Sequence, residues 1–259
     1  MFTLDTSSFP TTTDELAQAV TVSLRKWVDR PMVAATGVYP SLDSAEINLS
    51  GATFDAAEAP PDVRAVDQPT PGPTVDRFVL LAKPIQAHGV AAQLELTATK
   101  VRLSYAHNRA GQTIVLLTDA AAGRLQIDIA QRDLENAALF AAQAAARPHG
   151  IAVQRVELSL ACATPRELAV SARVTAKKLV TAIIRLSGRA IIDDQLNATL
   201  RNLAVDGDGM VAKIVVSLIR PHLQKLEGQQ QSLLALPGNI QLSGLALDAS
   251  DGLKLTAHF

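Results

Sequence analysis

The region from residue 151 to 205 alternates apolar and polar side chains with a period of two, and this pattern constrains the fold more than any other feature of the chain. Successive side chains of a β-strand point to opposite faces of its sheet, so each alternating run predicts a half-buried strand. Because the runs follow one another without intervening helices, they predict an antiparallel meander with one apolar and one polar face. The apolar positions of these runs are Val156, Leu158, Leu160, Leu168, Val170, Ala172, Val174, Val180, Ala182, Ile184, Leu186, Leu196, Ala198 and Leu200.

The alternation changes parity at two places, near Thr99–Lys100 and between Leu200 and Leu203. A change of parity inside one apolar run predicts a β-bulge, because an extra residue restores the apolar side chains to the buried face. Repeated bulges bend a long sheet, so we expect strong curvature.

Three segments have the apolar spacing of amphipathic helices: 12–28, about 132–146, and 209–227. The first begins with Thr12 and Glu15, the two residues of a capping box, in which each side chain satisfies a free backbone N–H. The second is rich in alanine, which permits close approach to another element.

The third helical segment is bounded by Asp208, the predicted N-cap, and by Gly228, the predicted C-terminal stop. Pro221 lies inside it and predicts a kink, since proline cannot donate to the preceding turn.

Strands that are interrupted by helices, without regular alternation of the two, predict an α+β protein. We expect a strongly curved, bulged antiparallel sheet wrapped around long amphipathic helices, in one domain over residues 1–259. The segment 56–74 contains five prolines and predicts an extended loop inserted in that domain.

Composition favours an apolar interior and argues against charged partners. Hydrophobic residues make up 48% of the chain and aromatic residues 3%, so the core is mainly aliphatic and suits acyl chains. The net charge is −1, which argues against nucleic-acid binding and against strong attachment to anionic lipid headgroups. Any contact with a membrane surface is therefore expected to be transient, local or apolar.

The sequence shows no pattern that predicts catalysis or metal binding. The histidines are scattered, HExxH and GxGxxG are absent, and no GxSxG or SxxK pattern stands in the context of a catalytic nucleophile. An enzyme acting on a hydrophobic substrate would need converging polar groups, and the sequence offers no such set. We expect no enzyme activity, no cofactor and no metal. Cys162 is the single cysteine, and neither a secretory signal nor a transmembrane span is recognised, so we expect a cytoplasmic protein.

Four segments resemble the bacterial single-domain branch of the tubular lipid-binding superfamily, which includes relatives of the bactericidal permeability-increasing and synaptotagmin-like lipid-transfer domains. They are IDIAQRDLENAAL (127–139), the meander of 151–205, GMVAKIVVSLIRPHLQKL (209–226) and LLALPGNIQLSGLALDASDGLKL (233–255). The resemblance covers residues 125–259. It implies a conical tube whose apolar lumen takes up a phospholipid or fatty-acyl chain without catalysis.

Two hypotheses about function follow. In the first, the protein binds or transfers a lipid in the apolar tube. In the second, an interaction scaffold of the same fold has a filled core, and its partners contact the polar sheet face or the proline-rich loop. The residues expected to line the tube are Leu134, Val156, Leu158, Leu160, Val170, Val174, Ile184, Leu186, Leu196, Leu200, Val211, Ile214, Val215, Leu218 and Ile219.

Overall fold

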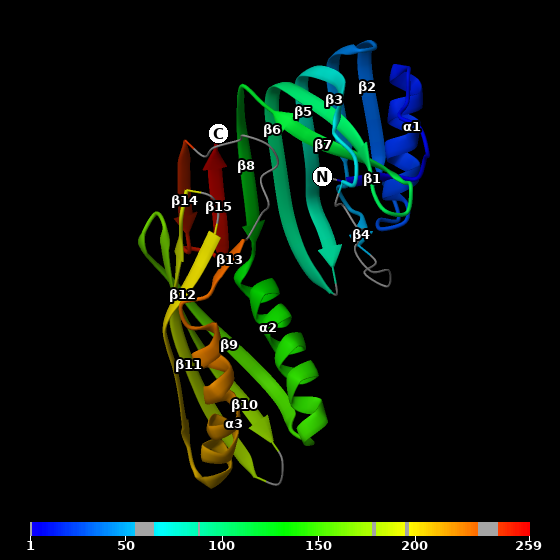
Figure 1. Ribbon diagram of the computed structural model, residues 1–259. Coiled ribbons are helices and arrows are strands. Elements are labelled where there is room, and N and C mark those ends of the chain that lie inside the picture. Colours follow the sequence, from blue (N-terminus) through cyan, green and yellow to red (C-terminus); the bar gives the residue numbers. More distant parts are fainter. Residues whose placement is uncertain (1, 55–64, 88, 178–179, 195–196, 233–242) are drawn as a thin grey trace. The chain divides into compact units, whose positions relative to one another are not determined.

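The computed structural model describes residues 2–54, 65–87, 89–177, 180–194, 197–232 and 243–259 (Figure 1). It corrects the predicted architecture, because most of the described residues are in β-strands and only a minority are in helices. Its helices are short: α1 is Thr13–Leu24, α2 is Gln131–Ala146 and α3 is Met210–Leu226.

The prediction of a sheet wrapped around long helices is wrong because strands occupy more of the chain than the alternation pattern indicated. The segments that form β5 and β6 have 18 residues each. Register shifts at Pro71/Thr74 and Ala82/Ile85 interrupt the alternation of β5, so the period of two is not continuous in its sequence. The described helices are too short to form an axis inside a wrapped sheet.

The strands form two sheets. The small sheet has the order β13-β12-β11-β10-β9, and the large sheet has the order β14-β15-β8-β6-β5-β3-β2, with β7 between β1 and β6 and with β4 beside β5. The described strands of the small sheet are β9 (Ala152–Thr164), β10 (Glu167–Lys177), β11 (Thr181–Ile192), β12 (Asn197–Asp208) and β13 (Gln230–Ser232). Those of the large sheet are β1 (Phe2–Leu4), β2 (Met32–Val38), β3 (Ser41–Asn48), β4 (Thr53–Phe54), β5 (Thr70–Ala87), β6 (Val90–His107), β7 (Thr113–Asp119), β8 (Ala122–Ile129), β14 (Gly244–Asp248) and β15 (Leu253–His258).

Contacts group the chain into two compact units. The first contains mainly residues 2–127 and 256–259, and the second contains mainly 128–232 and 245–255. Each unit has its own apolar core. The assignment of residues 1–259 to one domain stays a prediction.

The core of the first unit lies between α1 and the large sheet. Leu16 and Val20 of α1 are buried against residues such as Leu42, Val75 and Val101, which are at most 2% exposed. The Thr12 half of the predicted capping box is confirmed, because Thr12 Oγ1 accepts a hydrogen bond from the backbone N–H of residue 15 at 3.2 Å. The Glu15 carboxylate accepts from the backbone N–H of Thr11, one residue before the N-cap, at 2.9 Å.

The first part of the proline-rich segment, 56–64, lies outside the described residues, and its last residues, from Thr70 on, are strand. Thr70 pairs with Tyr105, and Pro71 pairs with Ser104. Pro73 is fully buried next to the register shift. A proline fits a strand where a bulge removes the need for its missing N–H, so the prediction of a loop up to residue 74 is wrong at this end.

Asp67, in the described part of this segment, is bound to the end of β6. The backbone N–H of His107 donates to Asp67 Oδ1 at 2.7 Å, and the imidazole Nδ1 lies 2.7 Å from Oδ2. The backbone hydrogen bond lowers the pKa of the Asp67 carboxyl, and the side-chain hydrogen bond to Asp67 raises the pKa of the His107 imidazole.

Asp67→Asn is expected to lower stability most between the ordinary pKa values of the two groups, 3.8 and 6.5. The contribution of Asp67 is present above its ordinary value and is lost as pH falls through its lowered folded pKa. The contribution of protonated His107 is present below its ordinary value and is lost as pH rises through its raised folded pKa. Urea midpoints of the wild type and the variant between about pH 4 and pH 9 measure this difference. A difference that is the same at pH 5 and pH 9 would contradict the expectation.

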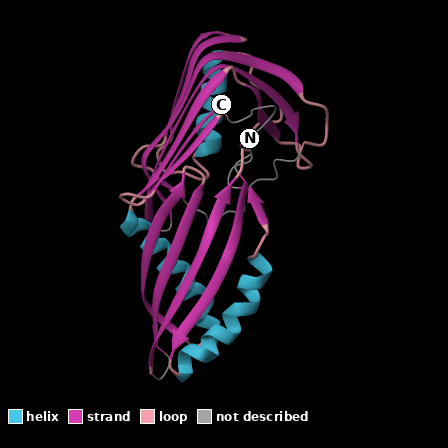
Figure 2. Cartoon of the chain, turned by 90° about the vertical axis from the view of Figure 1, so that its left-hand side faces the viewer, coloured by secondary structure: helices cyan, strands magenta, loops and turns pink. Residues whose placement is uncertain are grey.

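The second unit combines the small sheet with α2 and α3 (Figures 1 and 2). Figure 2 shows a helix along each side of the small sheet. Its core contains Val156, Val174 and Ile184 from the strands and Ala212 and Val216 from α3. These five residues are at most 9% exposed.

The bulges predicted from parity appear as local distortions of the described strands. Asn202 has φ +56°, and the register between β11 and β12 shifts between Ser187 and Arg189. Lys100 has φ +50°, and Ala98 and Val101 on either side of it are both buried. The extra residue therefore keeps apolar side chains on the buried face despite the change of parity.

The start of α3 differs from the predicted cap. Gly209 is the N-cap, and Asp208 accepts a hydrogen bond from Arg185 at 2.8 Å on the neighbouring strand. The sequence predicted that the Asp208 carboxylate would cap α3, but this carboxylate forms a cross-strand ion pair with Arg185 instead.

Candidate functional site

The residues predicted to line a tube share the helix-facing side of the small sheet where the strands are described. Val156, Val174 and Ile184 are buried in the core of the second unit. Leu196 lies outside the described residues, and so do the side chains of Val211, Ile214, Val215, Leu218 and Ile219. The half-buried members of the predicted set are Leu134, Leu158, Leu160, Val170, Leu186 and Leu200.

The α2 helix attaches to the edge of the small sheet through polar side chains. Strand β9 is an edge strand, so its outward backbone groups need other partners. Leu158 donates its N–H to Glu135 Oε1 at 3.0 Å, and its carbonyl accepts from Gln131 Nε2 at 2.7 Å. Further along, Gln143 Nε2 donates to the carbonyl of Val153 at 3.0 Å. These bonds place α2 along β9.

This attachment explains why α2 has no buried residue. It packs mainly on β9, whereas α3 packs on β12 and β11. The middle of the sheet, around Val170 and Ala172 of β10, is therefore only half-buried. We name this surface the apolar strip and define it by Leu158, Leu160, Val170, Ala172 and Leu186.

The strip has a purely apolar chemical character. On this side of the sheet, β10 and β11 place only alanine, valine, leucine, isoleucine and glycine between positions 168 and 192. Such a surface offers side chains for van der Waals contact and none for binding a charged group. It can hold an apolar ligand and has no residue that could perform acid–base chemistry.

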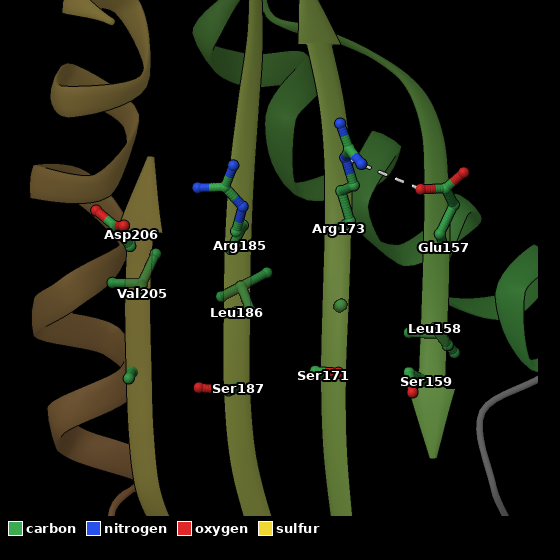
Figure 3. Close-up of a pocket in the computed structure, with 12 residues that line it drawn as sticks. Glu157, Leu158, Ser159, Ser171, Arg173, Arg185, Leu186, Ser187, Val205 and Asp206 are labelled. Atoms are coloured by element: carbon green, nitrogen blue, oxygen red, sulfur yellow. Dashed lines mark ion pairs between the residues drawn. The ribbon is translucent and has the colours of Figure 1, made fainter. Parts of the chain in front are cut away.

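The opposite face of the same strands is polar. A groove of about 520 Å³ on these strands is lined by polar side chains and also by Leu158, Ala172 and Leu186 of the strip (Figure 3). Its charged row crosses four strands in the order Glu157, Arg173, Arg185 and Asp206. The neighbouring row consists of Ser159, Ser171, Ser187 and Ala204 in the same strand order.

Ion pairs organise the charged row and the row beside it. Arg185 lies 2.8 Å from Asp208, while Arg173 lies 4.0 Å from Glu157. Glu157 has a shorter contact of 3.0 Å with Arg155.

No family model, curated protein or solved structure matches this chain. The resemblance to the tubular lipid-binding superfamily therefore stays a prediction, and the site has to be interpreted from its own chemistry.

The polar groove was missed in the sequence. The alternation assigned Arg173, Arg185 and the serines to the solvent face, and it gave no information on which of them face one another. The register between the strands brings them together, and register depends on contacts far apart in the sequence.

Other candidates for chemistry give no additional centre in the part of the chain that the structure describes. There, no group of three or more histidine, cysteine, aspartate or glutamate residues could hold a metal ion. Cys162 is half-buried, and this burial, followed by the charge of Asp248, raises the pKa of its thiol. The thiol is thus protonated at neutral pH and a weak nucleophile. None of the described helices combines the length and the apolar character needed to cross a membrane.

Proposed function

We propose that the protein binds the acyl chain of a lipid on the apolar strip, without catalysis. The observation that carries this proposal is the half-buried state of the strip beside an α2 helix that is attached at the sheet edge. The resemblance noted in the sequence points to the same class of ligand. A transient contact with a membrane surface would supply the lipid.

The energetics of an acyl chain fit such a surface. Each buried methylene contributes about 0.8 kcal/mol, so covering the strip with a chain of ordinary length gains several kcal/mol. Leu158, Val170 and Leu186 also gain by losing contact with water. The strip has no charged or hydrogen-bonding side chain that would recognise a headgroup, so binding is expected to depend on chain length more than on headgroup identity.

Native mass spectrometry of the purified protein, with organic extraction of the same sample, tests the proposal. We expect a stoichiometric fatty-acyl or phospholipid adduct, and uptake of a fluorescent fatty acid after its removal. Without an adduct or uptake the proposal fails, and the scaffold hypothesis, which the buried core of Val156, Val174 and Ile184 favours, takes its place.

Leu186→Gln is expected to weaken fatty-acid binding by about tenfold, because a half-buried amide loses its water when the chain covers it. Val180→Gln is the matched control, since Val180 is 64% exposed and lies outside the strip. Fluorescence titration measures both affinities, and circular dichroism checks the fold. Equal affinity of the two variants would place the ligand elsewhere.

A further inference from the structure

One end of the second unit brings together the connection between β10 and β11, the entry into β9 and the start of α3 (Figures 1 and 2). Lys177, the last residue of β10, pairs with Thr181 of β11 and with Ala152, the first residue of β9. The chain enters β9 from α2 through the 3₁₀-helix Arg147–His149. Strand β12 ends beside β11 at this end, and α3 follows it.

The segments that meet at this end are rich in cations. Residues 136–156, 168–192 and 209–226 contain no aspartate or glutamate, whereas they contain two, five and three arginines and lysines, respectively. The whole chain has a net charge of −1, so the positive charge of these segments is a local feature of the second unit.

Three exposed cations from different elements lie at this end. Arg147 follows the last residue of α2, Lys177 ends β10, and Lys213 is in the first turn of α3. All three residues are exposed, and none of them forms an ion pair with another described residue. An external anionic surface can therefore contact them without breaking a described ion pair.

The carboxylates of the polar face do not neutralise these cations. Glu157, Asp206 and Asp208 are matched there by as many arginines, at positions 155, 173 and 185. The three cations at the end of the unit are additional to this balanced set, so the end carries an excess of positive charge.

The same end also exposes an apolar side chain. Val180 directly precedes β11 and is 64% exposed, three residues after Lys177. A cation and an apolar side chain so close together suit the boundary of a bilayer, where the cation stays among the headgroups and the apolar group enters below them.

We propose that this end, the basic tip defined by Arg147, Lys177, Val180 and Lys213, contacts the surface of an anionic lipid bilayer. Each cation near such a surface strengthens the contact about fivefold. The three cations come from separate elements and do not form a pocket. A fluid surface fits them better than a rigid partner, because anionic lipids diffuse to wherever a cation lies.

The inference rests on the proposed function and adds to it the membrane from which the lipid comes. The basic tip and the apolar strip belong to the same unit and share strands β10 and β11. With only three cations the contact is weak and sensitive to salt, as a transient encounter with a lipid source requires.

Sedimentation of the full chain with vesicles tests the basic tip. We expect binding to mixed phosphatidylglycerol and phosphatidylcholine vesicles, little binding to pure phosphatidylcholine vesicles, and release at about 1 M salt, where the Debye length falls to about 3 Å. Lys177→Glu is expected to weaken binding to the anionic vesicles about twentyfold, because the substitution removes one attraction and adds one repulsion.

Lys225→Glu is the matched control. Lys225 is an exposed lysine of the same unit, but it lies in the last turn of α3, about 18 Å along the helix from Lys213. It should weaken vesicle binding far less than Lys177→Glu does. An equal loss in the two variants would reduce the effect to net charge and overturn the assignment to the tip.

Titration with a soluble fluorescent fatty acid separates this inference from the proposed function. Lys177→Glu is expected to keep the wild-type affinity for the fatty acid, because Lys177 lies outside the apolar strip. If the wild type takes up the fatty acid but does not bind anionic vesicles, the tip is refuted and the strip stands. Binding to soluble polyglutamate without binding to vesicles would assign the tip to an acidic protein partner and overturn the proposal.

Discussion

Ile114→Ala is expected to lower the free energy of unfolding by about 2–5 kcal/mol, because the lost methyl groups leave a cavity in a packed core. Ile114 is 0% exposed on β7, where its cross-strand partners are Thr3 on one side and Ala106 on the other. Strands on both sides limit the collapse of the cavity. Urea denaturation followed by circular dichroism measures the change, with an unchanged slope as the sign of an intact fold.

The same substitution at an exposed strand position provides the control. Ile191 of β11 is 39% exposed, and Ile191→Ala is expected to change stability by less than about 1 kcal/mol. Equal losses at the two positions would mean that β7 is not in the interior of the first unit.

Gly37→Ala is expected to destabilise the protein by about 2–4 kcal/mol, since both the backbone conformation and the available space exclude a side chain. Gly37 has φ +98° at the register shift between β2 and β3. A Cβ atom there would lie 2.5 Å from the backbone N of Asp43. The strain would also reach α1, because Thr13 donates its hydroxyl to the carbonyl of Gly37 at 3.0 Å. Thermal and urea unfolding of the variant measure the loss.

Gly51→Ala separates the two causes. Gly51 also has a positive φ, +75°, but nothing lies within 4 Å of the position of its missing Cβ. We expect a loss of about 1 kcal/mol from backbone strain alone. If Gly37→Ala costs no more than Gly51→Ala, the hairpin of β2 and β3 is open enough to move away from the new methyl group.

Local chemistry explains which parts of the fold were predictable from the sequence. The start of α1 depends on Thr12 and Glu15, which are neighbours in the chain, and the ends of α2 fall within a residue of the predicted range. The parity changes near Lys100 and Asn202 also have a local cause, since one inserted residue is enough to produce them.

Long-range pairing explains what could not be predicted. Pro71 was assigned to a loop because proline opposes regular strands, yet pairing with β6 includes it in β5. The helices were expected at the centre of a wrapped sheet because their apolar spacing was recognised while the partners of their polar side chains were not. Nothing in the sequence singled out Glu135, whose carboxylate accepts a hydrogen bond from the backbone of β9.

The candidate site was predictable on one face only. Apolar alternation identified the strip residues such as Leu158 and Leu186 one by one. The arginine pair of the groove required knowledge that Arg173 and Arg185 are cross-strand partners, and a period of two contains no information on register.

The attachment of α2 to β9 also determines how the small sheet behaves toward other chains. An exposed strand edge is a template on which an extended segment of another molecule can add by backbone pairing. Gln131 and Glu135 already use both outward groups of Leu158, and Gln143 uses the carbonyl of Val153. A strand that added to β9 at Val153 and Leu158 would therefore have to displace these three side chains.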